Sequence, residues 1–180
     1  MMMIFKTATV LLCGLSNLAY ASFGEGQLEG EATTYLEISP SKIIENAKFW
    51  LNPCVPYSQS SYHKGVGGTK YRQDCSGYVS MAWKLGTSQT TRTLDQYSKK
   101  ISKSELARGD ILLNAGEHTL IFDKWVDSGK SSYWAYEQHP GCTEHHKIPY
   151  PYHSNYDPSS YHPYRYNKVS AALANSTATA

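Results

Sequence analysis

Hydrophobic positions recur with helical spacing in two segments of the first half of the chain. The first segment follows Ser39-Pro40 and stops at Pro53, and its apolar residues fall on one face of a helix. The second segment starts at Asp74, a good N-cap residue, and stops at Gly86. Two helices are therefore predicted. Their apolar residues are Ile43, Ile44, Ala47, Trp50 and Leu51 in the first, and Val79, Ala82 and Trp83 in the second.

The second half of the chain changes to a strand pattern. Residues 111–113, 119–126 and 133–138 are apolar or aromatic runs, separated by turn residues such as Gly, Asn and Asp. Helices followed by a meander of strands are typical of an α+β domain. We therefore predict one α+β domain over residues 39–168, with the N-terminal helices packed on a small antiparallel sheet.

Residues 148–166 alternate Tyr, Pro and His, and we name this segment the Tyr/Pro-rich strap. Proline lacks a backbone N–H and has a fixed φ, so the segment is predicted to form neither a helix nor a central strand. We expect an extended chain whose rings cover the sheet, with a substrate platform as the alternative. Residues 22–38 are predicted to be a flexible lead-in, and residues 169–180 a disordered tail.

The first 21 residues resemble an export signal. Lys6 supplies a positive charge, residues 8–18 are mostly apolar, and Ala19-Tyr20-Ala21 matches the A-x-A cleavage pattern. The apolar stretch is too short to remain as a membrane anchor. We therefore predict a signal peptide over residues 1–21 and a secreted, extracellular protein.

Composition narrows the class of protein. The chain has 180 residues, enough for one domain of ordinary size. Its 17 Lys and Arg residues nearly balance its 15 Asp and Glu residues, so it lacks the cationic excess of a duplex-DNA binder. Beyond the N-terminal signal, no apolar run approaches the roughly 20 residues of a membrane span. We expect a monomer with no nucleic-acid partner and no membrane partner.

Export leaves three cysteines in the mature chain, because Cys13 is removed with the signal peptide. An odd number in an oxidising compartment implies either intermolecular pairing or one free thiol. Cys54 and Cys142 both lie in loop sequences next to Pro or Gly. A disulfide between them closes a long loop, worth roughly 4–5 kcal/mol in the chain-entropy model. That pairing leaves Cys75 as the free thiol.

Cys75 lies in the first turn of the second predicted helix, where unpaired N–H groups and the helix dipole favour a thiolate. A thiol nucleophile also needs a base, and His118 follows a Gly-Glu turn at the start of a predicted strand. Taken singly, such a cysteine is as often half of a disulfide or a small core residue, and such a histidine is more often structural. Together they nominate a nucleophile and its general base.

Three segments then carry a family resemblance. Residues 71–79 read YRQDCSGYV, residues 106–112 read LARGDIL, and residues 118–122 read HTLIF. In this order and spacing they resemble the NlpC-like cysteine peptidases, papain-like enzymes that act on peptides of the bacterial cell wall. The resemblance covers about residues 43–139 and implies a papain-like core of the NlpC type.

The resemblance also implies roles for residues near the nucleophile. Val55-Pro56-Tyr57 is similar to the family segment whose tyrosine lines the substrate cleft, which assigns substrate binding to Tyr57. Asp74 and Ser76, which flank Cys75, would hold the amino end of the substrate. The Tyr/Pro-rich strap is not part of the common family core, so substrate preference does not carry over.

A third polar residue is expected to orient His118, because one imidazole nitrogen must be held while the other meets the sulfur. The next strand offers Glu137 and Gln138, which alternate between its two faces. The flanking aromatic residues do not decide which face is used. We predict Glu137, since a carboxylate stabilises imidazolium more strongly than an amide does, and Gln138 is the alternative.

No metal or other cofactor is predicted. His139, His145 and His146 lie near Cys142, but their spacing matches no standard zinc pattern. Asp123 is expected to be a solvated turn charge.

The leading hypothesis is a secreted cysteine hydrolase that cleaves an amide bond in peptidoglycan stem peptides. One alternative is an amidase similar to the CHAP enzymes, or an acyltransferase, using the same Cys/His pair. Another is a catalytically silent secreted binding protein that uses the Tyr/Pro-rich strap for recognition.

Overall fold

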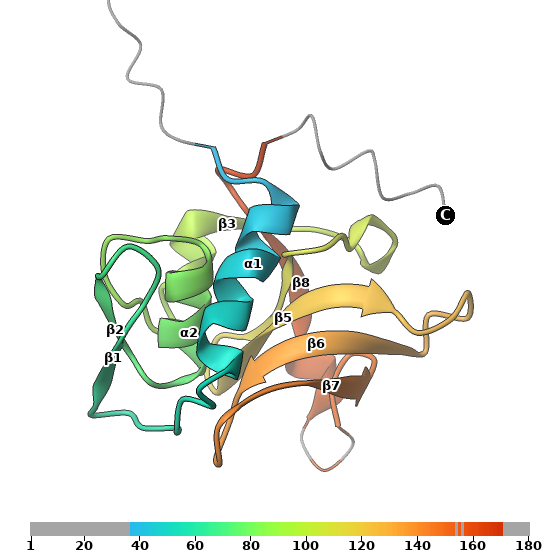
Figure 1. Cartoon of the computed structure of the whole chain (residues 1–180). Helices are drawn as coiled ribbons and strands as arrows, with labels where there is room; N and C mark the ends of the chain where they lie inside the picture. The colour runs from blue at the N-terminus through green and yellow to red at the C-terminus, as the bar shows by residue number, and fades with distance from the viewer. Residues whose placement is uncertain (1–36, 154, 156, 171–180) are drawn as a thin grey trace, which may run out of the picture. The chain divides into compact units, whose positions relative to one another are not determined.

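The computed structural model describes residues 37–153, 155 and 157–170, and Figure 1 shows them as a mixed fold of helices and a sheet. The predicted signal peptide lies outside the described residues, as do most of the lead-in and most of the tail. Within this part of the chain, no helix is long and apolar enough to cross a membrane. The helices are α1 (Pro40–Leu51) and α2 (Cys75–Ala82). The strands are β1 (Tyr62–Lys64), β2 (Lys70–Arg72), β3 (Ser98–Lys100), β4 (Ile111–Asn114), β5 (His118–Trp125), β6 (Ser132–Gln138), β7 (Thr143–Pro149) and β8 (His162–Tyr166).

Both predicted helices are present, and local capping explains where they start. The Ser39 side chain accepts a hydrogen bond from the Lys42 N–H at the start of α1, and the Asp74 side chain accepts one from the Gly77 N–H at the start of α2. Helix α2 ends earlier than predicted. It stops at Ala82 rather than near Gly86, and Lys84, with φ of 56°, takes the left-handed conformation that follows many helix ends.

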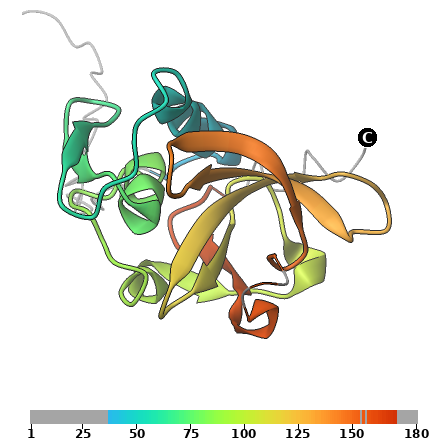
Figure 2. The same cartoon turned by 90° about the horizontal axis from the view of Figure 1, so that it is seen from below.

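The main sheet has six antiparallel strands in the order β3-β8-β4-β5-β6-β7. β1 and β2 form a separate two-stranded sheet beside α2. Figure 2 shows α1 and α2 lying together on one side of the curved main sheet. The three predicted strands correspond to β4, β5 and β6, at the centre of the sheet.

The Tyr/Pro-rich strap departs from the prediction, because its residues 162–166 form the interior strand β8, paired with β3 and β4. Pro163 is tolerated there because it lies just outside the regular pairing with β3, whose last pair is Lys100 with Tyr164. Beyond that point only the Pro163 carbonyl is used, and it accepts a hydrogen bond from the Ile101 N–H. The expectation that the strap holds no central strand was wrong.

The two faces of the main sheet have separate cores because successive strand residues point to opposite faces. Ile111, Ile121 and Tyr136 pack with the helices on the face that we call the helix side. Leu112 and Phe122 belong to the core of the other face, the strap side. Tyr152 and Tyr161 of the strap are buried in that second core, with ring centroids 4.5 Å apart. The strap therefore does cover the sheet, as predicted.

Candidate active site

Cys75 is the first residue of α2, and its side chain is buried in the folded chain. The turn around it is tightly packed. A Cβ at position 77 would lie 2.0 Å from the Arg72 carbonyl oxygen, so only glycine allows the end of β2 to run this close to the helix. The thiol is thereby fixed at the N-terminal end of α2, where the helix dipole favours negative charge.

The carboxylate next to Cys75 is already engaged. Arg72 Nε donates to Asp74 Oδ2 at 2.5 Å, and the Gly77 N–H donates to Asp74 Oδ1 at 2.8 Å. Arg72 Nη2 also donates to Ser76 Oγ at 3.0 Å. The negative charge of Asp74 is thus balanced by a guanidinium. Sequence reasoning missed Arg72, whose role depends on the fold of β2 against α2.

His118 begins β5, and the Cys75 thiol is close enough to act on the pKa of its imidazole. Its Nε2 lies 2.6 Å from Glu137 Oε1, which leaves Nδ1 outside this contact. Burial alone would lower the pKa of His118. The hydrogen bonds with Cys75 and Glu137 outweigh burial and raise the pKa to about 9, so the imidazole carries a proton at neutral pH.

Glu137 is 1% exposed and has partners on both carboxylate oxygens. Oε1 meets His118 and accepts a hydrogen bond from the Tyr152 hydroxyl at 2.5 Å. Oε2 lies 2.5 Å from His146 Nε2. Burial would raise the pKa of Glu137, but the contacts with His118, His146 and Tyr152 hold it well below its usual range. The side chain is therefore a buried carboxylate that is stabilised by hydrogen bonds from each direction.

Gln138 points to the opposite face of β6. Its Nε2 donates to the Val55 carbonyl at 3.0 Å, and its Oε1 accepts a hydrogen bond from Thr143. The geometry thus brings together Cys75, His118 and Glu137, and it gives Gln138 a place on the helix side, away from the imidazole.

Two hollows flank the Cys75–His118 pair. The first, about 310 Å³, adjoins Cys75, and the second, about 550 Å³, adjoins His118 and Glu137. Tyr57 lines the first hollow together with Asp74 and Ser76, so the residues expected to bind substrate do surround the thiol. Arg72 and Glu117 line it as well.

The predicted disulfide is present. Cys54 and Cys142 are joined, with Cα atoms 5.3 Å apart, and Cys75 is the remaining free cysteine among the described residues. The bridge connects the end of α1 to the turn between β6 and β7. It contributes no atom to the candidate site.

The three neighbouring histidines of the sequence do not form one cluster. His145 stacks on Tyr136 with ring centroids 4.1 Å apart, and its Nε2 lies 3.1 Å from Asp123 Oδ2. Asp123 is 7% exposed and also pairs with Arg108, so the prediction of a solvated charge was wrong. His146 lies on the other face of β7.

No protein-family model and no curated protein matches the chain. Three solved chains match, among them the crystal structure of an NlpC/P60 family protein from Bacillus cereus, at 15% identity and a TM-score of 0.47. That match covers 74% of this chain and 41% of the other.

Proposed function

We propose that this protein is a cysteine hydrolase that cleaves amide bonds with Cys75 as nucleophile and His118 as general acid and base. The proposal rests above all on one observation, the chain of groups Cys75, His118 and Glu137, in which Glu137 Oε1 lies 2.6 Å from His118 Nε2 and the thiol raises the pKa of the imidazole. Such a chain has the parts that thiol catalysis needs: a nucleophile, a proton carrier and a group that orients the carrier.

The proposed reaction follows from these positions. The Cys75 thiolate attacks the amide carbonyl, and N–H groups of the first turn of α2 stabilise the oxyanion that forms. His118, held protonated by Glu137, gives its proton to the leaving amine. It then takes a proton from water, the hydroxide attacks the thioester carbonyl, and the C–S bond breaks to release the acid and to restore the thiolate beside a protonated His118.

The substrate and the cellular location are further parts of the proposal. The sequence elements around Cys75 and His118 resemble those of cell-wall peptidases, so we propose peptidoglycan stem peptides as substrate and residues 39–168 as the papain-like catalytic domain. The Cys54–Cys142 disulfide is typical of an oxidising compartment, which supports secretion after removal of residues 1–21. Tyr57, Asp74 and Ser76 are proposed to contact the substrate.

The test is mass spectrometry of muropeptides after incubation with purified mature protein. We expect new peptide fragments with the wild type and a loss of at least about a thousandfold in turnover with Cys75→Ala or His118→Ala. Cys75→Ser should be nearly inactive, because an alcohol is harder to deprotonate than a thiol. His145→Gln is the matched control, since this histidine lies on the other side of the sheet, and it should keep normal turnover.

Three other outcomes would contradict the proposal. Retained activity in either Ala variant would exclude the assigned pair. Transfer of the acyl group to an added amine rather than to water would identify an acyltransferase. Retention on cell walls without any product would identify a binding protein.

A further inference from the structure

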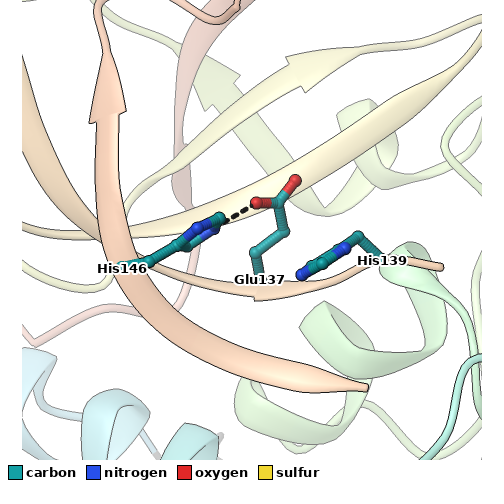
Figure 3. Close-up of side chains that lie close together, drawn as sticks. All are labelled: Glu137, His139 and His146. Atoms are coloured by element: carbon teal, nitrogen blue, oxygen red, sulfur yellow. Dashed lines mark hydrogen bonds and ion pairs between the residues drawn. The ribbon is translucent and has the colours of Figure 1, made fainter. Parts of the chain in front are cut away.

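A second polar cluster shares Glu137 with the candidate active site. It lies at the carboxylate oxygen Oε2, whereas His118 contacts Oε1. His139 follows Glu137 by two positions and lies one residue beyond the end of β6, so both side chains project from the same side of this segment. His146 on β7 pairs with Ala135 and is therefore a diagonal neighbour of Glu137 on that same face. Figure 3 shows the three side chains close together, with His146 in contact with the carboxylate.

The spacing of these groups is close to that of a metal site. Glu137, His139 and His146 each offer one ligand atom, and these atoms lie within 4.8 Å of one another. In a tetrahedral zinc site, the metal–ligand bonds are about 2.0–2.2 Å long and the ligand atoms lie roughly 3.3 Å apart. Small side-chain rotations would therefore bring these three atoms to the spacing that zinc needs. The Nε2 atom of His139 is buried and makes no hydrogen bond within the described residues.

The cluster is also accessible. The 550 Å³ hollow next to His118 is lined by Glu137 and by four of the seven histidines in the chain. Those histidines are His118, His139, His146 and His153. Glu144 adds a second carboxylate at the rim, where its Oε2 lies 3.4 Å from His139 Nε2. An ion that enters this hollow meets imidazole nitrogens and carboxylate oxygens together.

We propose that Glu137, His139 and His146 bind one Zn²⁺ ion, and that the bound ion slows the reaction at Cys75. Two imidazoles and one carboxylate suit zinc and other late first-row metals, whereas Mg²⁺ and Ca²⁺ prefer oxygen ligands alone. On binding, the ion replaces the proton shared by His146 and Glu137 Oε2, and that proton passes to water.

The inhibitory part of the inference rests on the proposed function, because it concerns the hydrolase reaction. Glu137 Oε1 holds His118 while Oε2 faces His146, so a single carboxylate links the two clusters. A cation on Oε2 withdraws negative charge from the whole carboxylate. The carboxylate then accepts a weaker hydrogen bond from His118, so it holds the imidazole less firmly in the orientation that the reaction at Cys75 needs.

Metal binding is tested first, without any measurement of turnover. Zn²⁺ is titrated by calorimetry into a Cys75→Ala protein, so that the thiol does not compete for the ion. We expect one ion per chain, with His139→Gln and His146→Gln each weakening the affinity by at least about tenfold. His145→Gln is the matched control on the opposite face of β7, and it should bind as the parent does. Mg²⁺ should give no signal.

Thermal unfolding checks that the variants are folded and repeats the test independently. Zn²⁺ should raise the Tm of the Cys75→Ala parent and leave that of the His139→Gln protein unchanged. Equal affinity in the parent and in both ligand variants, or no binding at all, would overturn the site.

Inhibition is tested on the hydrolase with an intact thiol. Zn²⁺ should inhibit wild type and His145→Gln at the same concentration, and His146→Gln only at a concentration at least about tenfold higher. Equal inhibition of all three proteins would show that zinc acts directly on Cys75 and would overturn the coupling. Absence of turnover without metal would count against the proposed function alone, since the binding result does not depend on it.

Discussion

The two sides of the main sheet contribute to the candidate site in different ways. On the helix side, apolar residues of α1, α2 and the sheet surround the helix that carries Cys75. On the strap side, the apolar core gives way to a polar group of side chains around Glu137, which supports His118. The position of Cys75 therefore depends on one local feature, the start of a helix. The position of His118 depends on strands and on a strap that are far apart in sequence.

Removal of the disulfide should have the largest effect, because it is the covalent link between α1 and the β6–β7 turn. The loop it closes spans 88 residues, and in the chain-entropy model its loss lowers the free energy of unfolding by about 4 kcal/mol. Denaturant unfolding of the Cys54→Ala/Cys142→Ala double variant measures this. The folded double variant should still be active, since neither cysteine touches the candidate site. A loss below about 1 kcal/mol would mean that packing alone holds α1 and the β6–β7 turn together.

Arg165→Met tests the buried ion pair on the strap side. Arg165 Nε donates to Asp110 Oδ1 at 2.9 Å, and Asp110 is 2% exposed. Without the guanidinium the carboxylate is buried and unpaired, which should lower the free energy of unfolding by about 3 kcal/mol at pH 7. Arg165→Lys keeps a cation and should lose less.

The same variant has a predicted pH dependence. Burial already raises the pKa of Asp110 above its ordinary value, and loss of Arg165 raises it further. A raised pKa in the folded state means that protonation on acidification favours folding, so the deficit of Arg165→Met should shrink as pH falls from 7 toward 4. An equal deficit at both pH values would contradict this explanation.

Glu137→Gln should lower kcat by about a hundredfold, or about 2.7 kcal/mol of transition-state stabilisation, because the amide cannot stabilise imidazolium. Gln138→Ala is the comparison, since Gln138 lies beside Glu137 on the opposite face. It should lose about 1 kcal/mol of stability through its broken hydrogen bond to Val55 and keep normal kcat. If Gln138→Ala lost most of its kcat while Glu137→Gln and Glu137→Ala kept normal kcat, Gln138 rather than Glu137 would be the residue that orients His118.

Tyr152→Phe should have the smallest effect. Its hydroxyl shares Glu137 Oε1 with His118, so its removal leaves the contact with the imidazole in place. We expect about 1 kcal/mol less stability and turnover within about threefold of wild type. A loss of turnover equal to that of Glu137→Gln would mean that the strap takes part in catalysis rather than in anchoring the carboxylate.

Local features of the site could be predicted from the sequence. The start of α2 depends on one short-range hydrogen bond between Asp74 and the Gly77 N–H, and the residues that make it are close in the chain. The same is true of the cap at Ser39. The cysteine pairing followed from the loop context of Cys54 and Cys142.

Features that depend on long-range packing could not be predicted. Aromatic residues are buried on both faces of β6, Tyr133 on the strap side and Tyr136 on the helix side, so the pattern left Glu137 and Gln138 as alternatives. The contacts of His146 and Tyr152 with Glu137 bring together three separate segments. The prediction that the strap forms no central strand was wrong because the missing N–H of Pro163 weakens a sheet only where the neighbouring strand would accept a hydrogen bond from it.

The placement of β8 has a consequence for when the protein folds. β3 and β4 do not pair with each other, because β8 lies between them. The six-stranded sheet therefore cannot close until residues 162–166 have been synthesised. Until then β3 and β4 expose edges that lack their partner strand. Insertion of β8 then joins these two strands and completes the sheet.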